Sequence, residues 1–591
     1  MIDSRLTTLR AEMQKKGVDA YILPISDPHQ SEYPATHWKS LEWISGFTGS
    51  AGTVLVAQNH AGLWTDSRYF IQGEQELATS SFELHKMTKQ HHPGYIDWCL
   101  QELPEGATVV IDGPMASVAQ RDRYAKALAK KKQTLTTTED FINGVWTGRP
   151  EIPTAQVFEH DIAYCGESRS DKLGRVRAEM KELGVDTHLI TTLDDIAWLM
   201  NLRGSDVECN PVFVSYCLIG PESTLLFIDT SKVSPELTQK LAADNIELKP
   251  YSDITSHLQS LTSEQGILIH KATLNVQLYD ALNPDINVVE GKLISRHLKA
   301  IKNSTEIGHI RAVHIKDGLA LTEAFYWLEQ TLQERTVTEY EFAAKLGECR
   351  SRKPGYFGNS FSAIVGYRGN GAIVHYRPHE DTSASIENKG ILLVDSGGQY
   401  TDGTTDITRT ITLSPPPNHQ KRAYTRVLQG HIGLATAIFP EGTVGGQLDT
   451  YARQHLWSDG MNYGHGTGHG VGFFLNVHEP PQGIAPGISG RATSKMKAGM
   501  FTSNEPGHYV TDDYGIRIEN LILTIPSKLE GFLAFETITY FPIDTQLIEF
   551  GLLTRKEVAW LNDYHQMVKD KLCPHLEGKL KAWMEEKCKA I

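Results

Sequence analysis

Four carboxylates and one imidazole lie in the last third of this 591-residue chain, in segments whose composition suits a metal site. Asp395 ends the apolar run ILLVD, and Asp406 lies in the β-branched run TTDITRTITL. His469 lies in HGTGHGVG, Glu505 in NEPG and Glu519 in GIRIEN. This donor set is rich in oxygen and carries excess negative charge, so it suits two divalent cations, and manganese better than a thiolate-loving metal. Because two adjacent metals are a recurring device for activating water, the residues point to hydrolysis.

Local patterning places these acidic residues at strand ends. Asp395 and Asp406 are eleven positions apart across the turn-rich segment SGGQYTDGTT, which predicts neighbouring strands with both carboxylates on one face. Glu505 precedes Pro-Gly and is expected to end a strand at a turn. In GIRIEN, alternation puts the two isoleucines on one face and Arg517 and Glu519 on the other. Each acidic residue alone is typical of a turn, a cap or a solvated strand end, and only the set indicates a site.

The histidine-containing segments admit other interpretations. His465 and His469 have the i,i+4 spacing of a zinc-binding helix, but no glutamate follows His465, and the glycines of HGTGHGVG disfavour a helix. The segment does not fit the dinucleotide pattern GxGxxG either, so its glycines are expected to let the backbone pass close to a ligand. His375 in AIVHYRP and His478 in NVHEPP suit a pocket wall, with a structural histidine as the alternative for each.

Composition excludes several functions. A net charge of −14 argues against a nucleic-acid surface, which requires a basic stripe, and against an anionic membrane. The seven cysteines are scattered without a CxxC pair, which favours a reducing compartment. The sequence has neither a secretory signal nor an apolar stretch that approaches the ~18 residues of a spanning helix. We therefore expect a cytoplasmic protein with no nucleic-acid or membrane partner.

The first half contains an internal repeat. The segment RLTTLRAEMQKKGVDAYIL at 5–23 parallels LGRVRAEMKELGVDTHLI at 173–190. In each copy an amphipathic helix ends at a glycine and a short apolar run follows, as expected for a buried strand. Later landmarks recur as well, so two helix-strand domains of similar plan are expected at about 1–155 and 156–296. The alternative is a common helix-to-strand junction that occurs twice by chance.

The second half has a different plan. Apolar spacing predicts helices over 297–345, and glycine-rich strands are expected from about 355 to 413. A helix is expected from about 419 to 439, followed by strands and loops that carry the remaining acidic residues to about 525. The tail at 555–591 is predicted to form surface helices with a solvated Lys and Glu face.

The ordered set of motifs resembles the pita-bread metallopeptidases, which include methionine aminopeptidase, prolidase and aminopeptidase P. The segments WTDSRY, LDDIAWLMNLRGSDVECNPVF, GAIVHYRP and FPIDTQLIEFGLLTRKEVAWLNDYH narrow the resemblance to the three-domain aminopeptidases P of family M24B. The resemblance spans nearly the whole chain. It implies a mixed α/β (α+β) fold with two creatinase-like N-terminal domains, at 1–155 and 156–296, and a C-terminal pita-bread catalytic domain at 297–591 that includes an extension at about 526–591.

The resemblance also implies a dinuclear site. Asp395 would bind one metal with both oxygens, Asp406 and Glu519 would bridge both metals, and His469 and Glu505 would complete one side. Manganese is the expected metal, with zinc and cobalt as alternatives. The remaining matches are the non-ligand histidines around the scissile bond and two residues that orient a ligand carboxylate: His375, His465 and His478, then Tyr509 and Arg517.

The implied activity is hydrolysis of the bond between an N-terminal residue and a penultimate proline, with a metal-bridging hydroxide as nucleophile and Glu505 as proton carrier. Peptides beginning Xaa-Pro would be the partners, and a homodimer is implied. The alternatives are a prolidase that cuts Xaa-Pro dipeptides and a non-enzymatic pita-bread binding module. Two departures from the family pattern, Arg377 and Pro480, bear on substrate preference, since Pro480 removes a backbone N–H beside His478.

Overall fold

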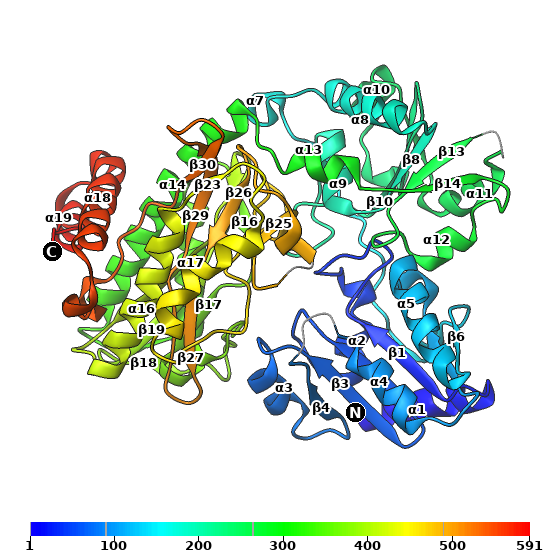
Figure 1. Cartoon of the computed structure of the whole chain (residues 1–591), viewed down its shortest axis with the longest axis horizontal. Coiled ribbons are helices and arrows are strands. Elements are labelled where there is room, and N and C mark those ends of the chain that lie inside the picture. Colours follow the sequence, from blue (N-terminus) through cyan, green and yellow to red (C-terminus); the bar gives the residue numbers. More distant parts are fainter. Residues whose placement is uncertain (1, 89–91, 263–264, 488–489) are drawn as a thin grey trace. The chain divides into compact units, whose positions relative to one another are not determined.

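The computed structural model describes residues 2–88, 92–262, 265–487 and 490–591 (Figure 1). The chain divides into two compact units, of which unit 1 comprises residues 1–161 and 167–295, and unit 2 comprises residues 162–166 and 296–591. Each unit has its own sheets and its own core, so each is described by itself.

Unit 1 begins with a six-stranded sheet of order β4-β3-β2-β1-β5-β6. The strands are β1 (Ala20–Pro24), β2 (Thr53–Ala57), β3 (His60–Thr65), β4 (Glu83–Lys86), β5 (Thr108–Ile111) and β6 (Thr134–Thr136). The helices of this part are α1 (Ile2–Lys15), α2 (Ser40–Ser45), α3 (Phe70–Leu77), α4 (Gly94–Glu102), α5 (Val118–Leu128) and α6 (Phe141–Val145).

Alternation along β1 explains why this sheet carries helices on both faces. Tyr21 and Leu23 pack with Leu9 of α1 on one face. Ala20 and Ile22 belong to a second cluster on the other face, together with residues of α4 and α5. Side chains of a strand point alternately to opposite faces, so a strand that is apolar at every position must be covered on both.

The second part of unit 1 repeats this topology. Its sheet has the order β12-β11-β10-β8-β13-β14, which matches the first sheet strand for strand. The strands are β8 (Thr187–Ile190), β10 (Ser215–Ile219), β11 (Thr224–Ile228), β12 (Ile246–Lys249), β13 (Gly266–Ile269) and β14 (Asn287–Glu290), and a separate pair is β7 (Phe158–Glu159) and β9 (Leu202–Arg203). The helices are α8 (Arg169–Leu183), α9 (Leu193–Met200), α10 (Pro235–Ala243), α11 (Ile254–Ser260) and α12 (Val276–Asp280). The predicted repeat is confirmed.

Glycine ends the first helix of each copy, as the sequence predicts. Gly17 and Gly184 have φ values of 65° and 67°, and a Cβ at either position would meet nothing within 4 Å. The glycine is therefore required by the left-handed backbone and not by close packing.

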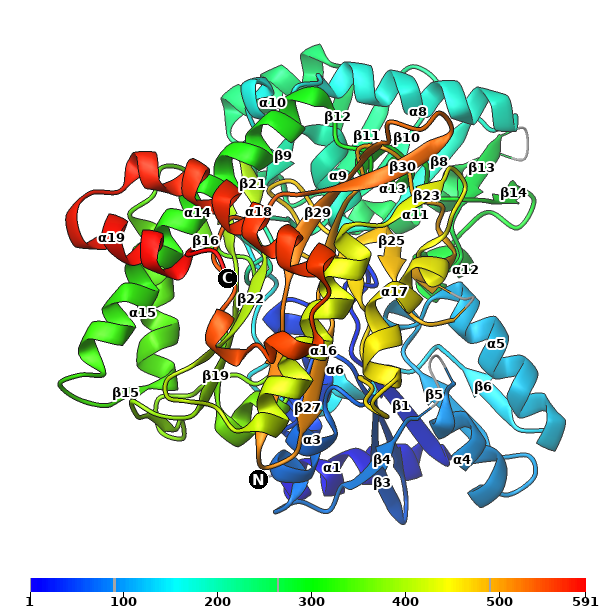
Figure 2. The same cartoon turned by 60° about the vertical axis from the view of Figure 1, so that its left-hand side comes forward.

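Unit 2 contains long helices around several sheets (Figure 2). The helices are α7 (Ile162–Cys165), α14 (Ser304–Thr331), α15 (Glu339–Ser351), α16 (Asn418–Ala435), α17 (Gly445–Trp457), α18 (Arg555–Leu572) and α19 (Gly578–Lys587), and α13 (Ile294–Lys299) lies where the two units join in sequence. A three-stranded sheet contains, in spatial order, β17 (Ile364–Tyr367), β19 (Ile391–Ser396) and β22 (Ile407–Thr412). A six-stranded sheet contains, in spatial order, β23 (Ile438–Pro440), β30 (Phe532–Thr537), β29 (Asn520–Pro526), β26 (Phe501–Asn504), β24 (Gly468–Gly470) and β25 (Glu479–Ile484).

Three further sheets complete the described part of unit 2. They are formed by β15 (Val337–Thr338) with β18 (Ser385–Ile386), by β16 (Tyr356–Asn359) with β20 (Gly398–Tyr400) and β21 (Gly403–Thr404), and by β27 (Gly507–Val510) with β28 (Tyr514–Arg517). The predicted helical segment 297–345 is interrupted by β15, because Thr338 caps a new helix by accepting a hydrogen bond from the Glu341 N–H. The helix predicted to reach residue 439 ends at Ala435 instead.

A large hydrophobic core joins several helices and strands of unit 2, beside separate smaller clusters. It includes Ala324 of α14, Phe342 of α15, Val394 of β19 and Leu428 of α16. The C-terminal helices α18 and α19 pack against this core through residues such as Leu561. Figure 2 shows these helices in red beside α14. The tail is thus part of the packing of unit 2 as well as of its surface.

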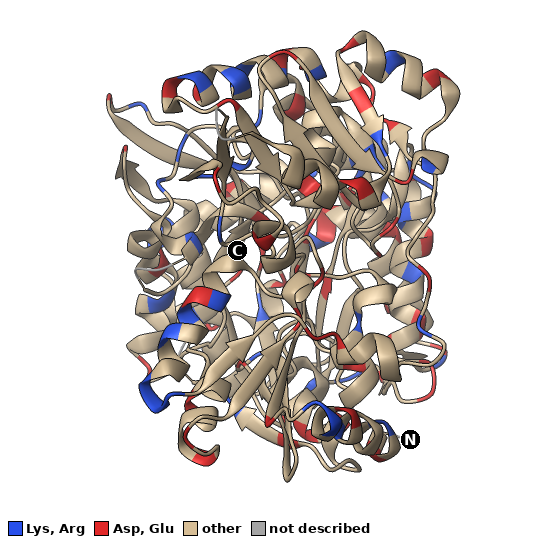
Figure 3. Ribbon diagram, turned by 90° about the vertical axis from the view of Figure 1, so that its right-hand side faces the viewer, with Lys and Arg blue, Asp and Glu red and all other residues tan. Residues whose placement is uncertain are grey.

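The surface is mixed in charge. On the face shown in Figure 3, basic and acidic segments alternate along the helices. Among the residues that the structure describes, no helix is both long and apolar enough to cross a membrane.

Candidate metal centre

The two aspartates come from neighbouring antiparallel strands, as their spacing predicts. Asp395 lies near the end of β19 and pairs with Thr408 of β22, and Asp406 immediately precedes β22. Both are buried, with exposed fractions of 8% and 4%. The turn between the strands therefore returns the second carboxylate to the same end of the sheet as the first.

The two glutamates extend this acidic group from a second pair of strands. Glu505 directly follows β26 and Glu519 directly precedes β29, and these strands pair so that Asn504 lies opposite Asn520. The Glu519 N–H donates to the Thr408 carbonyl at 3.1 Å, and the Thr408 hydroxyl donates to Glu519 Oε2 at 2.8 Å. Thr408 thus ties the strand that carries Glu519 to the strand beside Asp395.

His469 supplies the nitrogen of the cluster. It lies in β24, and its Nε2 is 3.5 Å from Asp406 Oδ2 and 3.4 Å from Glu505 Oε1. Its Nδ1 is 3.0 Å from the Gly470 carbonyl, which can only accept, so Nδ1 carries a proton and Nε2 is the nitrogen available to a metal. Ligand atoms of Asp406, His469 and Glu519 all lie within 4.8 Å of one another, a spacing that can hold a metal ion.

Electrostatics shows that this cluster needs a cation. Burial raises the pKa of Asp406 well above its usual value, and the charges of Glu519, Asp395 and Glu505 raise it further. Burial likewise raises the pKa of Glu519, with Asp395 and Glu505 adding to the effect and Arg517 opposing it. One guanidinium therefore faces four carboxylates, so protons or metal ions must supply the missing positive charge.

One oxygen in particular is prepared for a ligand. Asp395 Oδ2 accepts a hydrogen bond from Arg517 Nη2 at 2.6 Å. Its Oδ1 is buried, and among the described residues no group hydrogen-bonds to it. A buried carboxylate oxygen without a donor is costly, and a bound divalent cation would remove that cost. The donor set and this oxygen fit the two-metal centre that the sequence predicts.

Behind Asp395, a chain of hydrogen bonds joins the predicted orienting residues. Arg517 Nη1 donates to the Tyr509 hydroxyl at 2.7 Å, and that oxygen is 2.8 Å from His465 Nε2. His465 Nδ1 is 2.8 Å from the Gly466 carbonyl, so in the neutral imidazole Nε2 accepts from Tyr509. Burial raises the pKa of Tyr509 to about 12, which keeps its proton in place for this role.

The other two predicted histidines stand differently in the structure. His478 lies beside His469, with ring centroids 4.3 Å apart and ring planes at 68°. His375 is half-buried and follows Val374, whose carbonyl is 3.4 Å from Arg517 Nη2. Arg377 is half-buried two residues further on. His478 is therefore placed at the cluster by direct ring contact, and His375 by its main-chain neighbour.

Sequence reasoning missed a buried ion pair that fixes the glycine-rich segment. Arg453 and Asp449 of α17 pair at 2.7 Å, and Arg453 also donates to the carbonyls of Tyr463 and His465. Asp449 accepts from the Thr467 hydroxyl at 2.5 Å, and the Thr467 carbonyl accepts from the Glu505 N–H at 2.8 Å. The available signal was an i,i+4 acid–base pair on a helix, which is too common in sequences to single out.

A second buried pair lies next to His478. Glu479 is 0% exposed and accepts from Lys302 Nζ at 2.5 Å, while Lys299 Nζ lies 3.7 Å from its other oxygen. Pro480, which follows it in β25, is half-buried. The backbone that presents His478 is thus anchored by an acid whose partners lie about 180 residues earlier in the chain.

Comparison with known families agrees with this geometry. Residues 5–145 and 148–306 both match the creatinase/prolidase N-terminal domain, residues 308–525 match metallopeptidase family M24, and residues 531–591 match the C-terminal region of that peptidase family. The fold and the site thus define a metallopeptidase that carries two creatinase-type domains.

Full-length relatives narrow the class. A probable Xaa-Pro aminopeptidase P of Laccaria bicolor is 40% identical, covering 99% of this chain and 93% of its own. Aminopeptidase P2 of Arabidopsis thaliana is 38% identical, covering 98% and 87%. A crystal structure described as the X-prolyl aminopeptidase of Caenorhabditis elegans, a cytosolic enzyme with a di-nuclear active site, is 32% identical with a TM-score of 0.95 and covers all of both chains. The chain belongs to the Xaa-Pro aminopeptidase P family of M24 metallopeptidases.

Proposed function

We propose that the protein is a metalloaminopeptidase that releases the N-terminal residue of peptides whose second residue is proline. The observation that carries the proposal is the complete cluster of four carboxylates and one histidine, in which Asp406, His469 and Glu519 already lie at metal-binding spacing. The relatives that match over nearly the whole chain support the choice of substrate.

The residues divide into those that would hold metal and those that would act on the peptide. Two divalent ions would be held by Asp395, Asp406, His469, Glu505 and Glu519. When bound, the ions would lower the pKa of water toward neutrality and polarise the substrate carbonyl. Manganese suits this oxygen-rich set best, with zinc and cobalt as alternatives.

The chain's own residues then perform the proton transfers and the charge stabilisation. Glu505 accepts the proton of the attacking water and delivers it to the departing proline nitrogen. His478 and His375 hydrogen-bond the peptide carbonyl oxygen as negative charge develops on it. Arg517 fixes Asp395, and Tyr509 links that guanidinium to His465, so the residues behind the site hold the carboxylate in one orientation.

Proline explains why such a dedicated enzyme is useful. The bond before proline is a tertiary amide without an N–H. Peptidases that bind the substrate backbone through that N–H cannot bind this bond productively. An enzyme that recognises the free N-terminal amine and the carbonyl can bind it.

Other properties follow from the family. We propose domains at 1–155, 156–296 and 297–591, a homodimer and a cytoplasmic location, in line with the cytosolic description of the C. elegans enzyme. Light scattering of purified protein tests the dimer: a mass near twice 65.8 kDa supports it, and a mass of one chain contradicts it.

Mass spectrometry of peptide products tests the activity. The protein is loaded with manganese and incubated with an Arg-Pro-Pro peptide, an Arg-Pro dipeptide and an Arg-Ala-Pro peptide. Release of only the first residue from Arg-Pro-Pro, abolished by chelator and by Asp406→Asn, supports the proposal. Cleavage of the dipeptide alone would identify a prolidase, and bound metal without any cleavage would favour a binding module.

A further inference from the structure

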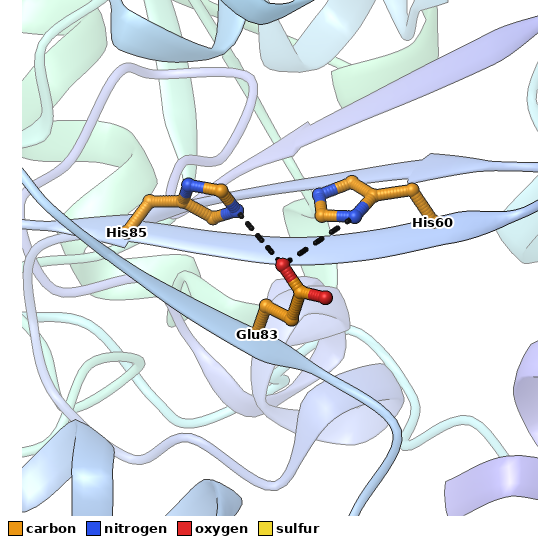
Figure 4. Close-up of side chains that lie close together, drawn as sticks. All are labelled: His60, Glu83 and His85. Atoms are coloured by element: carbon orange, nitrogen blue, oxygen red, sulfur yellow. Dashed lines mark ion pairs between the residues drawn. The ribbon is translucent and has the colours of Figure 1, made fainter.

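A second group of metal-ligand side chains lies in unit 1, at the edge of the first sheet (Figure 4). His60 begins β3, and Glu83 and His85 lie on β4, the edge strand that runs parallel to β3. The pairing places Gly62 opposite Glu83 and Trp64 opposite His85. Because side chains two residues apart share a face of a strand, His60, Glu83 and His85 all project from the same face.

The three side chains converge without bonding to one another. His60 Nδ1 and His85 Nε2 each lie 3.9 Å from Glu83 Oε2, and Figure 4 shows both rings directed at that oxygen. A distance of 3.9 Å is too long for a hydrogen bond. One ligand atom from each residue lies within 4.8 Å of the others, a spacing that can hold a metal ion.

Stacked indoles hold the two imidazoles in place. Trp64 stacks on His85 with centroids 4.0 Å apart and planes at 6°, and Trp98 stacks on His60 at 4.5 Å and 19°. Gly62 leaves room for this arrangement, since a Cβ there would lie 2.6 Å from the Trp64 ring and 2.7 Å from His60 Nε2. The positions of the two imidazoles are therefore fixed by packing before any ion arrives, which lowers the entropic cost of binding.

Burial of the two imidazoles favours their neutral form, which is the form that binds a metal. Burial lowers the pKa of His60, with Arg10 lowering it further, and burial lowers the pKa of His85, with His60 lowering it further. Glu83 opposes both effects. A neutral imidazole offers one nitrogen lone pair to a metal, and a carboxylate offers its oxygens. In addition, His85 Nε2 is buried, and among the described residues no group hydrogen-bonds to it.

We propose that His60, Glu83 and His85 form a binding site for one zinc ion, separate from the catalytic centre. Two imidazole nitrogens and one carboxylate oxygen are a common zinc set, with water in the fourth position. Tetrahedral zinc with bonds of about 2.0–2.2 Å places its ligand atoms roughly 3.3 Å apart, so the observed 3.9 Å needs only a small inward movement. Glu83 can make it, because 71% of its side chain is exposed.

The ion would join the edge strand to its neighbour. β4 has only four residues and pairs with β3 alone. A ligand that binds the folded state and not the unfolded chain stabilises the fold by mass action. Zinc would therefore stabilise the first part of unit 1, independently of peptide hydrolysis.

Zinc stoichiometry of the full-length protein tests the site. Wild type and variants are dialysed against buffered, low-micromolar free zinc, and the metal is measured by plasma mass spectrometry. His85→Phe keeps a ring to stack on Trp64 but removes a ligand, and Glu83→Gln changes an exposed group without altering its size. Glu74→Gln is the matched control, because it removes an exposed charge that pairs with Lys86 on the same strand.

We expect wild type and Glu74→Gln to hold one zinc more than His85→Phe and Glu83→Gln. Zinc should also raise the thermal midpoint of the first two proteins above that of the other two. Manganese-dependent peptidase activity should be the same in all four, because none of these residues belongs to the catalytic cluster. Equal zinc content in all four proteins, or an equal loss in Glu74→Gln, would overturn the proposal.

Discussion

At the residue scale, the contact between Arg517 and Asp395 determines how a metal can be held. Arg517 is 1% exposed, and it bonds Asp395, Tyr509 and the Thr408 hydroxyl at once. Lysine offers a single point charge and cannot reproduce this fork. We expect Arg517→Lys to weaken manganese affinity about 10–100-fold, as for other residues that orient a ligand. Titration against a competing chelator measures this affinity, and the exposed Arg311→Lys serves as the control. Unchanged manganese affinity in Arg517→Lys would contradict the orienting role.

His478 leads to a different expectation, because its ring contacts the ring of His469 and its proposed role is to hydrogen-bond the peptide carbonyl. We expect His478→Ala to reduce turnover about 100- to 1,000-fold, the usual effect of removing a donor to a developing oxyanion. Its metal content should equal that of wild type. Steady-state kinetics and metal analysis on the same sample test this, with the exposed His92→Ala as control. A normal rate would refute the role of His478, and lost metal would make the residue structural.

At the scale of elements, helix α16 supports the two strand ends that carry the glutamates. His431 Nδ1 is 3.1 Å from the Asn504 carbonyl, and the Asn520 amide lies 3.1 Å from His431 Nε2. Asn504 precedes Glu505 and Asn520 follows Glu519, so one buried imidazole holds both strand ends. The carbonyl fixes a proton on Nδ1, and in the neutral imidazole Nε2 accepts from the Asn520 amide.

This arrangement predicts a dependence of stability on pH. Burial, followed by the charge of Arg409, lowers the pKa of His431 to about 3. The unfolded chain therefore takes up a proton below about pH 6.5 that the fold excludes, so stability present above that pH is lost as the pH falls toward 3. Between pH 7 and 5 the loss is about 2 kcal/mol. We expect the metal-free His431→Gln variant to have a lower thermal midpoint than wild type at pH 7. It should lose less stability than wild type between pH 7 and pH 5. Equal losses of stability in the two proteins would contradict this prediction.

The same elements show what a sequence can and cannot predict. The strands that carry Asp395 and Asp406, the strand end before Glu505 and the non-helical glycine segment all followed from local patterning. The family resemblance then implied the metal-binding role of each residue in the set. The Asp449–Arg453 and Lys302–Glu479 pairs could not be predicted, because each depends on which distant segments the fold brings together. Local periodicity also could not find the break before α15, since a cap depends on one residue.

At the scale of the whole molecule, the division into two units separates the consequences of metal binding. All five residues of the catalytic cluster lie in unit 2. A ligand that binds one folded unit stabilises that unit by mass action and leaves an independently folding one unchanged. Manganese should therefore move the unfolding transition of unit 2 and leave that of unit 1 in place.

The acidic cluster also determines how the stabilisation of unit 2 by manganese changes with pH. Because the pKa values of Asp406 and Glu519 are raised in the fold, the metal-free unit holds protons that the unfolded chain releases. Its stability therefore falls as the pH rises above the ordinary carboxyl range of about 4. Metal must displace those protons, so its affinity increases with pH. Scanning calorimetry should show a larger manganese-induced rise in the unit 2 midpoint at pH 8 than at pH 6, and no such rise in Asp406→Asn. A rise that is equal at both pH values, or one confined to unit 1, would show that manganese acts somewhere other than these carboxylates.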